Sequence, residues 1–180
     1  MAHRYVSDPR TIILCVVPAN ADMTTSDGLQ MARQLDPKGI RTVGVITKID
    51  IMDRGTNAKR MIMNQEVPLR MGYVGVKNRA QEDIINQIPV AQAIAKEQEY
   101  FASHPIYSTM PPGSLGCDVL TAKLSKILFT HIKHNLPEII REIRQKLKET
   151  EDELKDLGVP MPSSQADKMH LLWNMITEFV

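Results

Sequence analysis

The sequence predicts an α/β fold: a partial parallel sheet with flanking helices, followed by an α-helical bundle segment. Three short apolar runs, at residues 12–17, 42–46 and 72–76, have the length of buried strands. The segments between them carry helix signals, and strands that alternate with helices form a parallel sheet. Beyond residue 117 the apolar residues recur at helical spacing, so the rest of the chain is expected to be helical.

The first strand is predicted at Ile12 to Val17, a continuous apolar run typical of a strand that is covered on both faces. A loop at 18–22 and helix caps at Thr24 to Asp27 follow, and Asp36-Pro37-Lys38-Gly39 ends the helix. Val43 to Ile46 is the second strand. A short helix around residues 59–64 precedes the third strand, and Val90 to Phe101 forms a further helix, joined to the next one by a Pro/Gly/Ser-rich connection.

Two helices are predicted on either side of Pro137. Asp118 to Asn135 is amphipathic, and Pro137 is expected to interrupt it and to occupy the first turn of a new helix. Apolar residues of that helix follow a heptad seam broken only at Thr150. The seam spans about three heptads and ends at Gly158, which favours an intramolecular bundle; the alternative is a homodimeric coiled coil. The seam consists of Leu136, Ile140, Ile143, Leu147, Thr150, Leu154 and Leu157. A last apolar helix begins at Lys168.

The composition excludes several classes of function. The 22 basic and 21 acidic residues leave a net charge of +1, whereas a dedicated nucleic-acid binder usually has a basic excess, so no direct nucleic-acid partner is expected. Two distant cysteines give neither a disulfide framework nor a zinc site, which indicates a cytoplasmic protein. No metal ligands are expected; His131 and His134 lack an acidic or thiol companion. The longest apolar run is too short to span a bilayer, so any membrane contact is peripheral.

The most informative motif is Thr47-Lys48-Ile49-Asp50, which follows the second strand directly. The carboxylate of Asp50 can accept hydrogen bonds from both N1–H and the exocyclic amine of guanine, a pair that adenine does not offer. The stem of Lys48 can lie along the base, and Thr47 can brace the loop. The alternative is a solvated loop without a ligand.

A second polar loop, Lys77-Asn78-Arg79-Ala80-Gln81, follows the third strand. In an open parallel sheet, ligands bind beyond the carboxyl ends of the strands, where both loops are predicted to lie. In guanine-nucleotide proteins the loop after this strand closes the other side of the base, and its polar side chains reach the ribose. The alternative is a helix cap with a surface charge.

The two loops closely resemble those of the dynamin superfamily of large GTPases, with Asn78-Arg79 where small Ras-like GTPases carry Ser-Ala-Lys. Further similar motifs cover nearly the whole chain: Pro18-Ala19-Asn20-Ala21-Asp22, Leu35-Asp36-Pro37-Lys38-Gly39, Phe101-Ala102-Ser103-His104-Pro105 and His131-Ile132-Lys133-His134-Asn135-Leu136-Pro137. Residues 159–162, with Lys168-Met169, look more like the antiviral Mx branch, so the resemblance leaves the branch open.

The resemblance implies a P-loop GTPase-type sheet and a role for several residues. Lys48 and Asp50 would contact guanine, and the base and the ribose would be lined by Asn78, Arg79 and Gln81. Asp22 and Asp53 would face a partner G domain, and Asp53 would also approach nucleotide; the plain alternatives are loop acids, with Asp53 capping the next helix. Pro137 would be the hinge. The implied domains are 1–116, the C-terminal part of the G domain; 117–159, a helical bundle signalling element; and 160–180, the start of a stalk.

The resemblance also implies that the intact protein binds GTP or GDP and hydrolyses GTP to drive membrane remodelling or fission. It would self-associate through its G domains and stalk, and it would be recruited peripherally to membranes. The sequence contains no Gly-x-x-x-x-Gly-Lys-Ser/Thr phosphate loop. We therefore expect a fragment without catalytic residues of its own, inactive alone, with Mg²⁺ bound by residues outside this chain. The alternatives are an Mx-like antiviral GTPase and a non-enzymatic helical interaction module.

Overall fold

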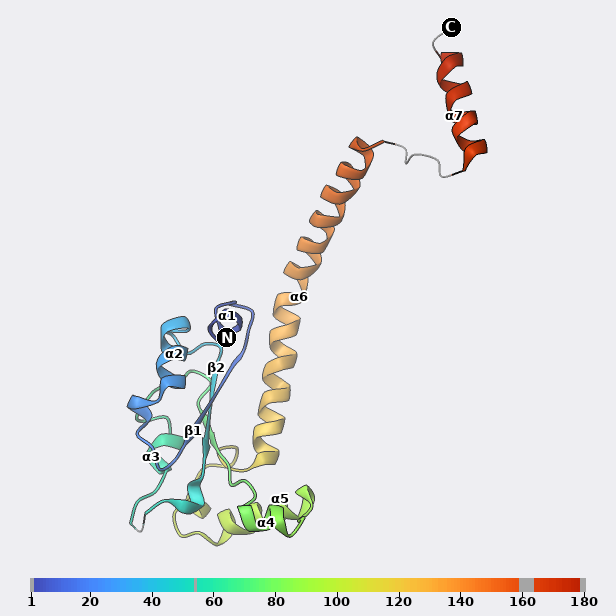
Figure 1. Cartoon of the computed structure of the whole chain (residues 1–180). Helices are drawn as coiled ribbons and strands as arrows, with labels where there is room; N and C mark the ends of the chain where they lie inside the picture. The colour runs from blue at the N-terminus through green and yellow to red at the C-terminus, as the bar shows by residue number, and fades with distance from the viewer. Residues whose placement is uncertain (1, 54, 159–163, 179–180) are drawn as a thin grey trace. The chain divides into compact units, whose positions relative to one another are not determined.

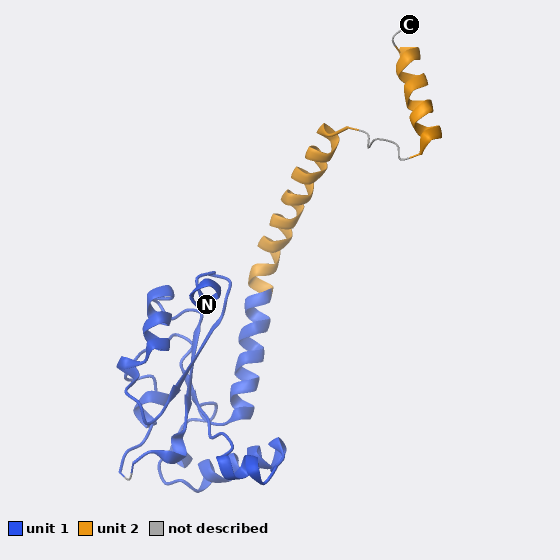
Figure 2. Cartoon of the chain, viewed as in Figure 1, with its two compact units in different colours: residues 1–132 blue, residues 133–180 orange. Residues whose placement is uncertain are grey.

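The computed structural model describes residues 2–53, 55–158 and 164–178. The chain divides into two compact units, residues 1–132 and residues 133–180 (Figure 2). The first unit contains a sheet, the helices that cover it and the beginning of the long helix α6 (Cys117–Asp156). The second contains the remainder of α6 and helix α7 (Gln165–Glu178). The predicted order, an α/β part followed by a helical part, is confirmed.

The described strands of the sheet are parallel and stand in the order β1-β2-β3 (Figure 1). β1 is Ile13–Pro18, β2 is Thr42–Thr47 and β3 is Tyr73–Gly75, so all three strands lie within a residue or two of their predicted places. Pairing of Val17 with Ile46, and of Ile46 with Gly75, sets the register. The carboxyl ends of the three strands therefore lie at one edge of the sheet.

The central strand β2 is buried on both faces, as its apolar sequence predicts. On one face Gly44 pairs with Tyr73, and a Cβ at Gly44 would lie 2.0 Å from Cδ1 of the tyrosine ring. The ring occupies the space that a side chain would fill. Its hydroxyl donates to the carbonyl oxygen of Val67 at 2.8 Å, which fixes the ring across the strand.

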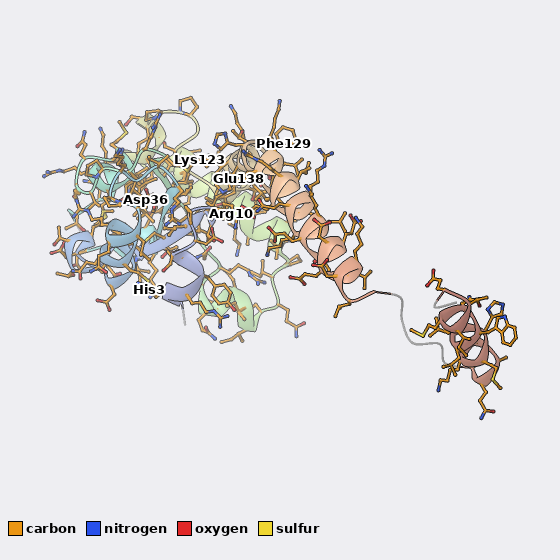
Figure 3. The ribbon with its side chains drawn as sticks, turned by 90° about the horizontal axis from the view of Figure 1, so that it is seen from above. His3, Arg10, Asp36, Lys123, Phe129 and Glu138 are labelled. Atoms are coloured by element: carbon orange, nitrogen blue, oxygen red, sulfur yellow. The ribbon has the colours of Figure 1, made fainter. Side chains whose placement is uncertain are left out.

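Helices cover the two faces of the sheet unequally. One face packs against α2 (Asp27–Leu35), α3 (Lys59–Ile62) and α5 (Val90–Ser103), and it forms the main core. That core includes Cys15, Val17, Met23, Leu29, Ile46, Ile49, Ile62, Tyr73, Phe101 and Tyr107. The other face is covered by the first turns of α6, where Cys117, Val119 and Leu120 pack on Val45, Val74 and Val76. Of the side chains labelled on α6 in Figure 3, Lys123 is partly buried and Phe129 is 70% exposed.

The prediction that the first strand is covered on both faces is wrong for the described residues. Leu14 and Val16 are 47% and 55% exposed, while Ile13, Cys15 and Val17 are buried. The reason is that the first turns of α6 pack over β2 and β3 but not over β1. β1 is one of the two outer strands of the described sheet, and of its two faces the one toward α2 is covered.

The helix break predicted at Pro137 is also wrong, because α6 continues through this residue. Proline lacks the N–H that would bond to the carbonyl group four residues earlier, at a cost of about 3 kcal/mol in a helix interior. Long helical stretches on both sides supply enough regular hydrogen bonds to outweigh that loss. The apolar seam beyond Pro137 is exposed within its unit, with Ile143, Leu147 and Leu154 each more than half exposed.

The predicted last helix is confirmed as α7, which begins at Gln165, three residues before Lys168. Ser164 accepts a hydrogen bond from the backbone N–H of Asp167 at 3.1 Å, a helix-capping contact. The segment at 159–162, which resembles the Mx branch, lies outside the described residues. The proposed domain boundaries remain predictions. None of the helices in the described ranges has the length and hydrophobicity needed to cross a bilayer.

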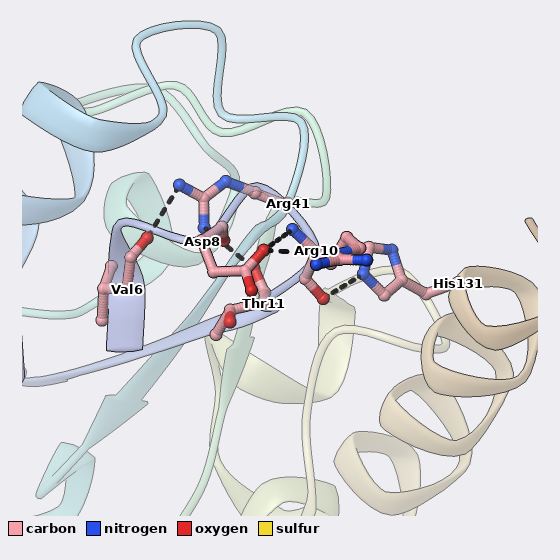
Figure 4. Close-up of polar contacts among 6 residues, drawn as sticks. All are labelled: Val6, Asp8, Arg10, Thr11, Arg41 and His131. Atoms are coloured by element: carbon pink, nitrogen blue, oxygen red, sulfur yellow. Dashed lines mark hydrogen bonds and ion pairs between the residues drawn. The ribbon is translucent and has the colours of Figure 1, made fainter. Parts of the chain in front are cut away.

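The N-terminal segment, which includes α1 (Ala2–Val6), is tied to the sheet through Arg41 (Figure 4). The Arg41 guanidinium donates to the carbonyl oxygens of Val6, Asp8, Thr11 and Leu35 at 2.9 to 3.2 Å. Nearby, His131 of α6 bonds through Nε2 to the carbonyl oxygen of Arg10 at 2.6 Å. Because the acceptor is a carbonyl group, Nε2 must carry the proton.

The turn between α2 and β2 is organised by the buried side chain of Asp36. Its carboxylate accepts hydrogen bonds from the N–H of Ile40 at 3.0 Å, the N–H of Arg41 at 2.9 Å and the Thr42 hydroxyl at 2.7 Å. Burial raises the pKa of Asp36, but the hydrogen bonds and the charge of Arg41 outweigh it, so the net pKa lies below its usual value of 3.8.

We predict that Asp36→Asn lowers stability at pH 7 by about 1–3 kcal/mol, because the amide nitrogen would face backbone donors. A depressed folded-state pKa contributes stability above the unfolded-state pKa near 3.8, and this contribution is lost as pH falls through the folded-state value. Urea unfolding between pH 2 and 7 should therefore show a shallower acid limb for Asp36→Asn than for the wild type. The exposed Asp27→Asn is the control; an identical pH dependence for all three proteins would contradict the role of Asp36.

Candidate functional site

Three loops leave the sheet at its carboxyl edge, one after each strand. They comprise residues 19–22, 48–53 and 76–81. Two backbone hydrogen bonds join them across the strand ends: Ala19 N–H donates to the carbonyl oxygen of Thr47 at 2.8 Å, and Val76 N–H donates to that of Ile46 at 2.8 Å. The two polar loops that the sequence analysis singled out are therefore neighbours, as predicted from the parallel topology.

The loop after β2 is a tight turn anchored by a buried isoleucine. Lys48 has φ 58° and ψ 33°, in the left-handed region that non-glycine residues rarely adopt. The turn leads into the short 3₁₀ helix η2 (Ile49–Ile51), in which Ile49 is only 2% exposed and packs close to Gly75 of β3. Lys48 and Asp50, the residues before and after the buried Ile49, both have exposed side chains.

The loop after β3 leads into helix α4 (Gln81–Ile85). Asn78, Arg79 and Gln81 are exposed, and Arg79 also donates to the carbonyl oxygen of Ile88 at 3.1 Å. The turn into α4 is held by Asp83, which accepts from the N–H of Ala80 at 3.0 Å. A salt bridge of 2.8 Å from Lys96 to Asp83 lowers the pKa of that carboxyl and connects α4 with α5.

Tyr100 of α5 lies beside the loop after β3. The ammonium group of Lys77 is 5.2 Å from the centre of the Tyr100 ring, a cation–π contact. The pKa of Tyr100 is raised first by burial, then by Tyr107, and then by the negative charge of Asp50. Lys77, the first residue of the second loop, is therefore held against an aromatic side chain of α5.

Asp22 and Asp53, the predicted partner-facing acids, are both exposed in these loops. Asp22 caps the short 3₁₀ helix η1 (Met23–Thr25): its carboxylate accepts from the N–H and the hydroxyl of Thr24, each at 2.8 Å, and these bonds lower its pKa. Asp53 does not cap α3, since Asn57 accepts from the N–H of Lys59 at 3.1 Å instead. Contact with a partner remains a prediction for both acids.

A pocket of about 470 Å³ lies on the α5 and α6 side of the loop after β3. It is lined by Lys77, Asn78, Arg79, Ile84, Val90, Ala93, Ile94, Glu97, Cys117 and Thr121. Lys48 and Asp50 do not line it. The pocket therefore adjoins the second loop, including the predicted base-contacting residues Asn78 and Arg79, but not the first loop.

Glu97 of α5, which is 1% exposed, was not among the residues predicted to belong to the site. Its carboxylate accepts from the N–H of Lys77 at 2.7 Å and from the N–H of Cys117 at 2.8 Å, so it supports the second loop from behind. A signal was present in the sequence: Ile94, Glu97 and Phe101 follow the three-and-four spacing of a buried helix face. An acid at such a position requires hydrogen-bond partners.

Comparisons with known proteins agree with these motifs. The family model for the dynamin central region matches residues 57–180, and the dynamin family model matches residues 1–49. The chain is 43% identical over 175 residues to Dynamin-B of Dictyostelium discoideum, covering 97% of this chain and 19% of that protein. Its identity to Dynamin-2 of Homo sapiens is 37% over 179 residues, covering 99% of this chain and 20% of that protein. The chain thus spans about a fifth of the length of these relatives.

We predict that Lys48→Gly raises the stability of the fold by about 1 kcal/mol, because glycine adopts the left-handed conformation without a steric cost. Lys48→Val should lower it, since a β-branched residue is least tolerated there. Thermal and urea unfolding measure both effects. Lys59→Gly, in helix α3, is the control and should lower stability by up to about 1 kcal/mol. Equal losses for Lys48→Gly and Lys59→Gly would show that the Lys48 backbone is unstrained.

Proposed function

Because the chain belongs to the dynamin family, we propose that its carboxyl-edge loops bind the base of GTP and GDP in an intact protein that hydrolyses GTP. The observation that supports the proposal is the β2–β3 register, with Val76 N–H bonded to the carbonyl oxygen of Ile46, because it makes the loop that contains Lys48 and Asp50 a neighbour of the loop at 76–81. The motif Thr47-Lys48-Ile49-Asp50 supplies the chemistry for guanine, and the second loop supplies the opposite wall.

In this proposal, the exposed carboxylate of Asp50 accepts hydrogen bonds from guanine N1–H and from its exocyclic amine. Adenine has no such pair of donors on that edge, so binding of ATP would leave the carboxylate without partners. The stem of Lys48, which is exposed at the left-handed turn, lies along the base in this proposal. Asn78, Arg79 and Gln81 close the other side of the base and reach the ribose.

The reaction proposed for the intact protein is attack of water on the γ-phosphate of GTP, which yields GDP and phosphate. Phosphoryl transfer needs a backbone cradle for the phosphates and a bound Mg²⁺ that neutralises developing charge. We assign neither to residues of this chain, whose role is to fix the base and so orient the nucleotide. Accordingly, the 180-residue chain alone is proposed to give no measurable GTP turnover.

The partners proposed are a second G domain and, through the helical part, further copies of the protein. Asp22 and Asp53 are exposed at the same edge as the base-contacting loops, where an opposing G domain would meet them. The helix α6 begins beside the base-contacting loops, and Pro137, which lacks one helical hydrogen bond, is the proposed hinge. From family membership, the work done by this motion is membrane remodelling or fission by a cytoplasmic, peripherally recruited protein.

We predict that Asp50→Asn in the intact protein weakens binding of GTP by tenfold or more and strengthens binding of xanthosine triphosphate. The amide can donate to the C2 carbonyl of xanthine but cannot accept both guanine donors. Titration with fluorescent guanine and xanthine nucleotides measures the preference, with the exposed Glu66→Gln as control. An unchanged preference for GTP over the xanthine nucleotide would exclude Asp50 as the base-reading residue.

A further inference from the structure

The buried carboxylate of Glu97 joins two parts of the first unit that are far apart in sequence. Oε1 accepts a hydrogen bond from the N–H of Lys77, in the loop after β3, and Oε2 accepts from the N–H of Cys117, the first residue of α6. Both distances, 2.7 and 2.8 Å, are typical of hydrogen bonds to a charged acceptor. One side chain therefore holds the proposed base-contacting loop and the beginning of a 40-residue helix.

The surroundings of Glu97 are suited to a charge. A buried carboxylate is costly unless it is hydrogen-bonded, and this one receives two backbone donors and the Cys117 thiol, 3.4 Å from Oε1. Its position at the N-terminus of α6 is favourable because the unpaired N–H groups of a helix start attract negative charge. Burial, the hydrogen bond to Glu97 and its charge raise the pKa of the Cys117 thiol to about 12, so the thiol stays protonated and can donate.

The backbone on either side of these contacts is paired as well. Gly75 of β3 donates from its N–H to the carbonyl oxygen of Ser114 at 2.9 Å, and Gly116 donates to the carbonyl oxygen of Gly75 at 2.8 Å. Gly116, the residue before Cys117, is thus hydrogen-bonded to Gly75 at the end of β3. Gly75 lies two residues before Lys77 in the sequence. Glu97 extends this attachment beyond the strand, into the loop itself.

We propose that Glu97 is a positioning residue through which the base-contacting loop and the start of α6 are coupled, so that guanine-nucleotide affinity depends on its carboxylate. This inference rests on the proposed function. Glu97 is buried behind the loop and acts through the N–H of Lys77. Coupling of this kind is reciprocal: nucleotide that orders the loop also orders the start of α6.

The test compares Glu97→Gln with the wild type in the intact protein, with Glu99→Gln, an exposed glutamate of the same helix, as matched control. Glutamine has one acceptor oxygen, so its NH₂ group would face the N–H of either Lys77 or Cys117, and that hydrogen bond would be lost. We expect the dissociation constant for GDP to rise about tenfold, the KM for GTP to rise while kcat changes little, and the preference for guanine over xanthine to remain. Glu99→Gln should match the wild type.

Amide hydrogen exchange provides the readout that a merely structural role would not change. In the wild type, GDP should slow exchange at residues 48–51, at Lys77 and at Cys117. In folded Glu97→Gln, protection should remain at residues 48–51 and disappear at Cys117. GDP affinity within twofold of the wild type, or retained protection at Cys117, would overturn the inference.

If Glu97→Gln fails to fold, Cys117→Pro decides, with Cys117→Ala as its control. Proline is tolerated at the first position of a helix and removes the N–H that donates to Oε2 together with the thiol, whereas alanine removes the thiol and keeps the N–H. Protection extending to residues 118–121 on GDP binding in the proline variant would overturn the coupling, and its loss would support it. Failure of the wild type to bind GDP would instead contradict the proposed function itself, so the two failures are distinguishable.

Discussion

The close packing of Tyr73 over Gly44 is the constraint on which the rest of the first unit depends. Only glycine leaves room for the ring, since a Cβ there would lie 2.0 Å from Cδ1. The pair fixes β3 against β2 in a register that sets Ile46 opposite Gly75. A shift of one residue would move the ring onto a side chain and expose the buried strand faces. The loops after β2 and β3 meet because this register holds.

Two energetically unfavourable features of the first unit lie at the carboxyl edge of the sheet. Lys48 holds a left-handed backbone conformation, and Glu97 holds a charge at 1% exposure, directly behind the neighbouring loop. Strained backbone and buried charge persist only where the surrounding structure compensates for them, and they concentrate at functional sites. Here the compensation comes from the buried Ile49 on one side and from the N–H groups of Lys77 and Cys117 on the other.

The strands, their parallel arrangement and the meeting of the two polar loops could be predicted from the sequence, because apolar runs and parallel topology depend on local pattern. The predictions that failed concern the surroundings of a segment, which its own pattern does not contain. Burial of the Leu14 and Val16 face of β1 depends on which strands α6 covers, and the continuity of α6 through Pro137 depends on the length of helix on both sides. Glu97 was missed because its partners lie 20 residues away in either direction.

We propose that one edge of the sheet, built from the loops after β2 and β3, reads guanine, and a crystal structure of the intact protein with GDP is the decisive experiment. We expect the base between the Lys48 stem and the loop at 78–81, with both Asp50 carboxylate oxygens within hydrogen-bond distance of guanine N1 and the exocyclic amine. A base bound elsewhere, or an Asp50 carboxylate without contact to the base, would exclude this edge as the guanine site.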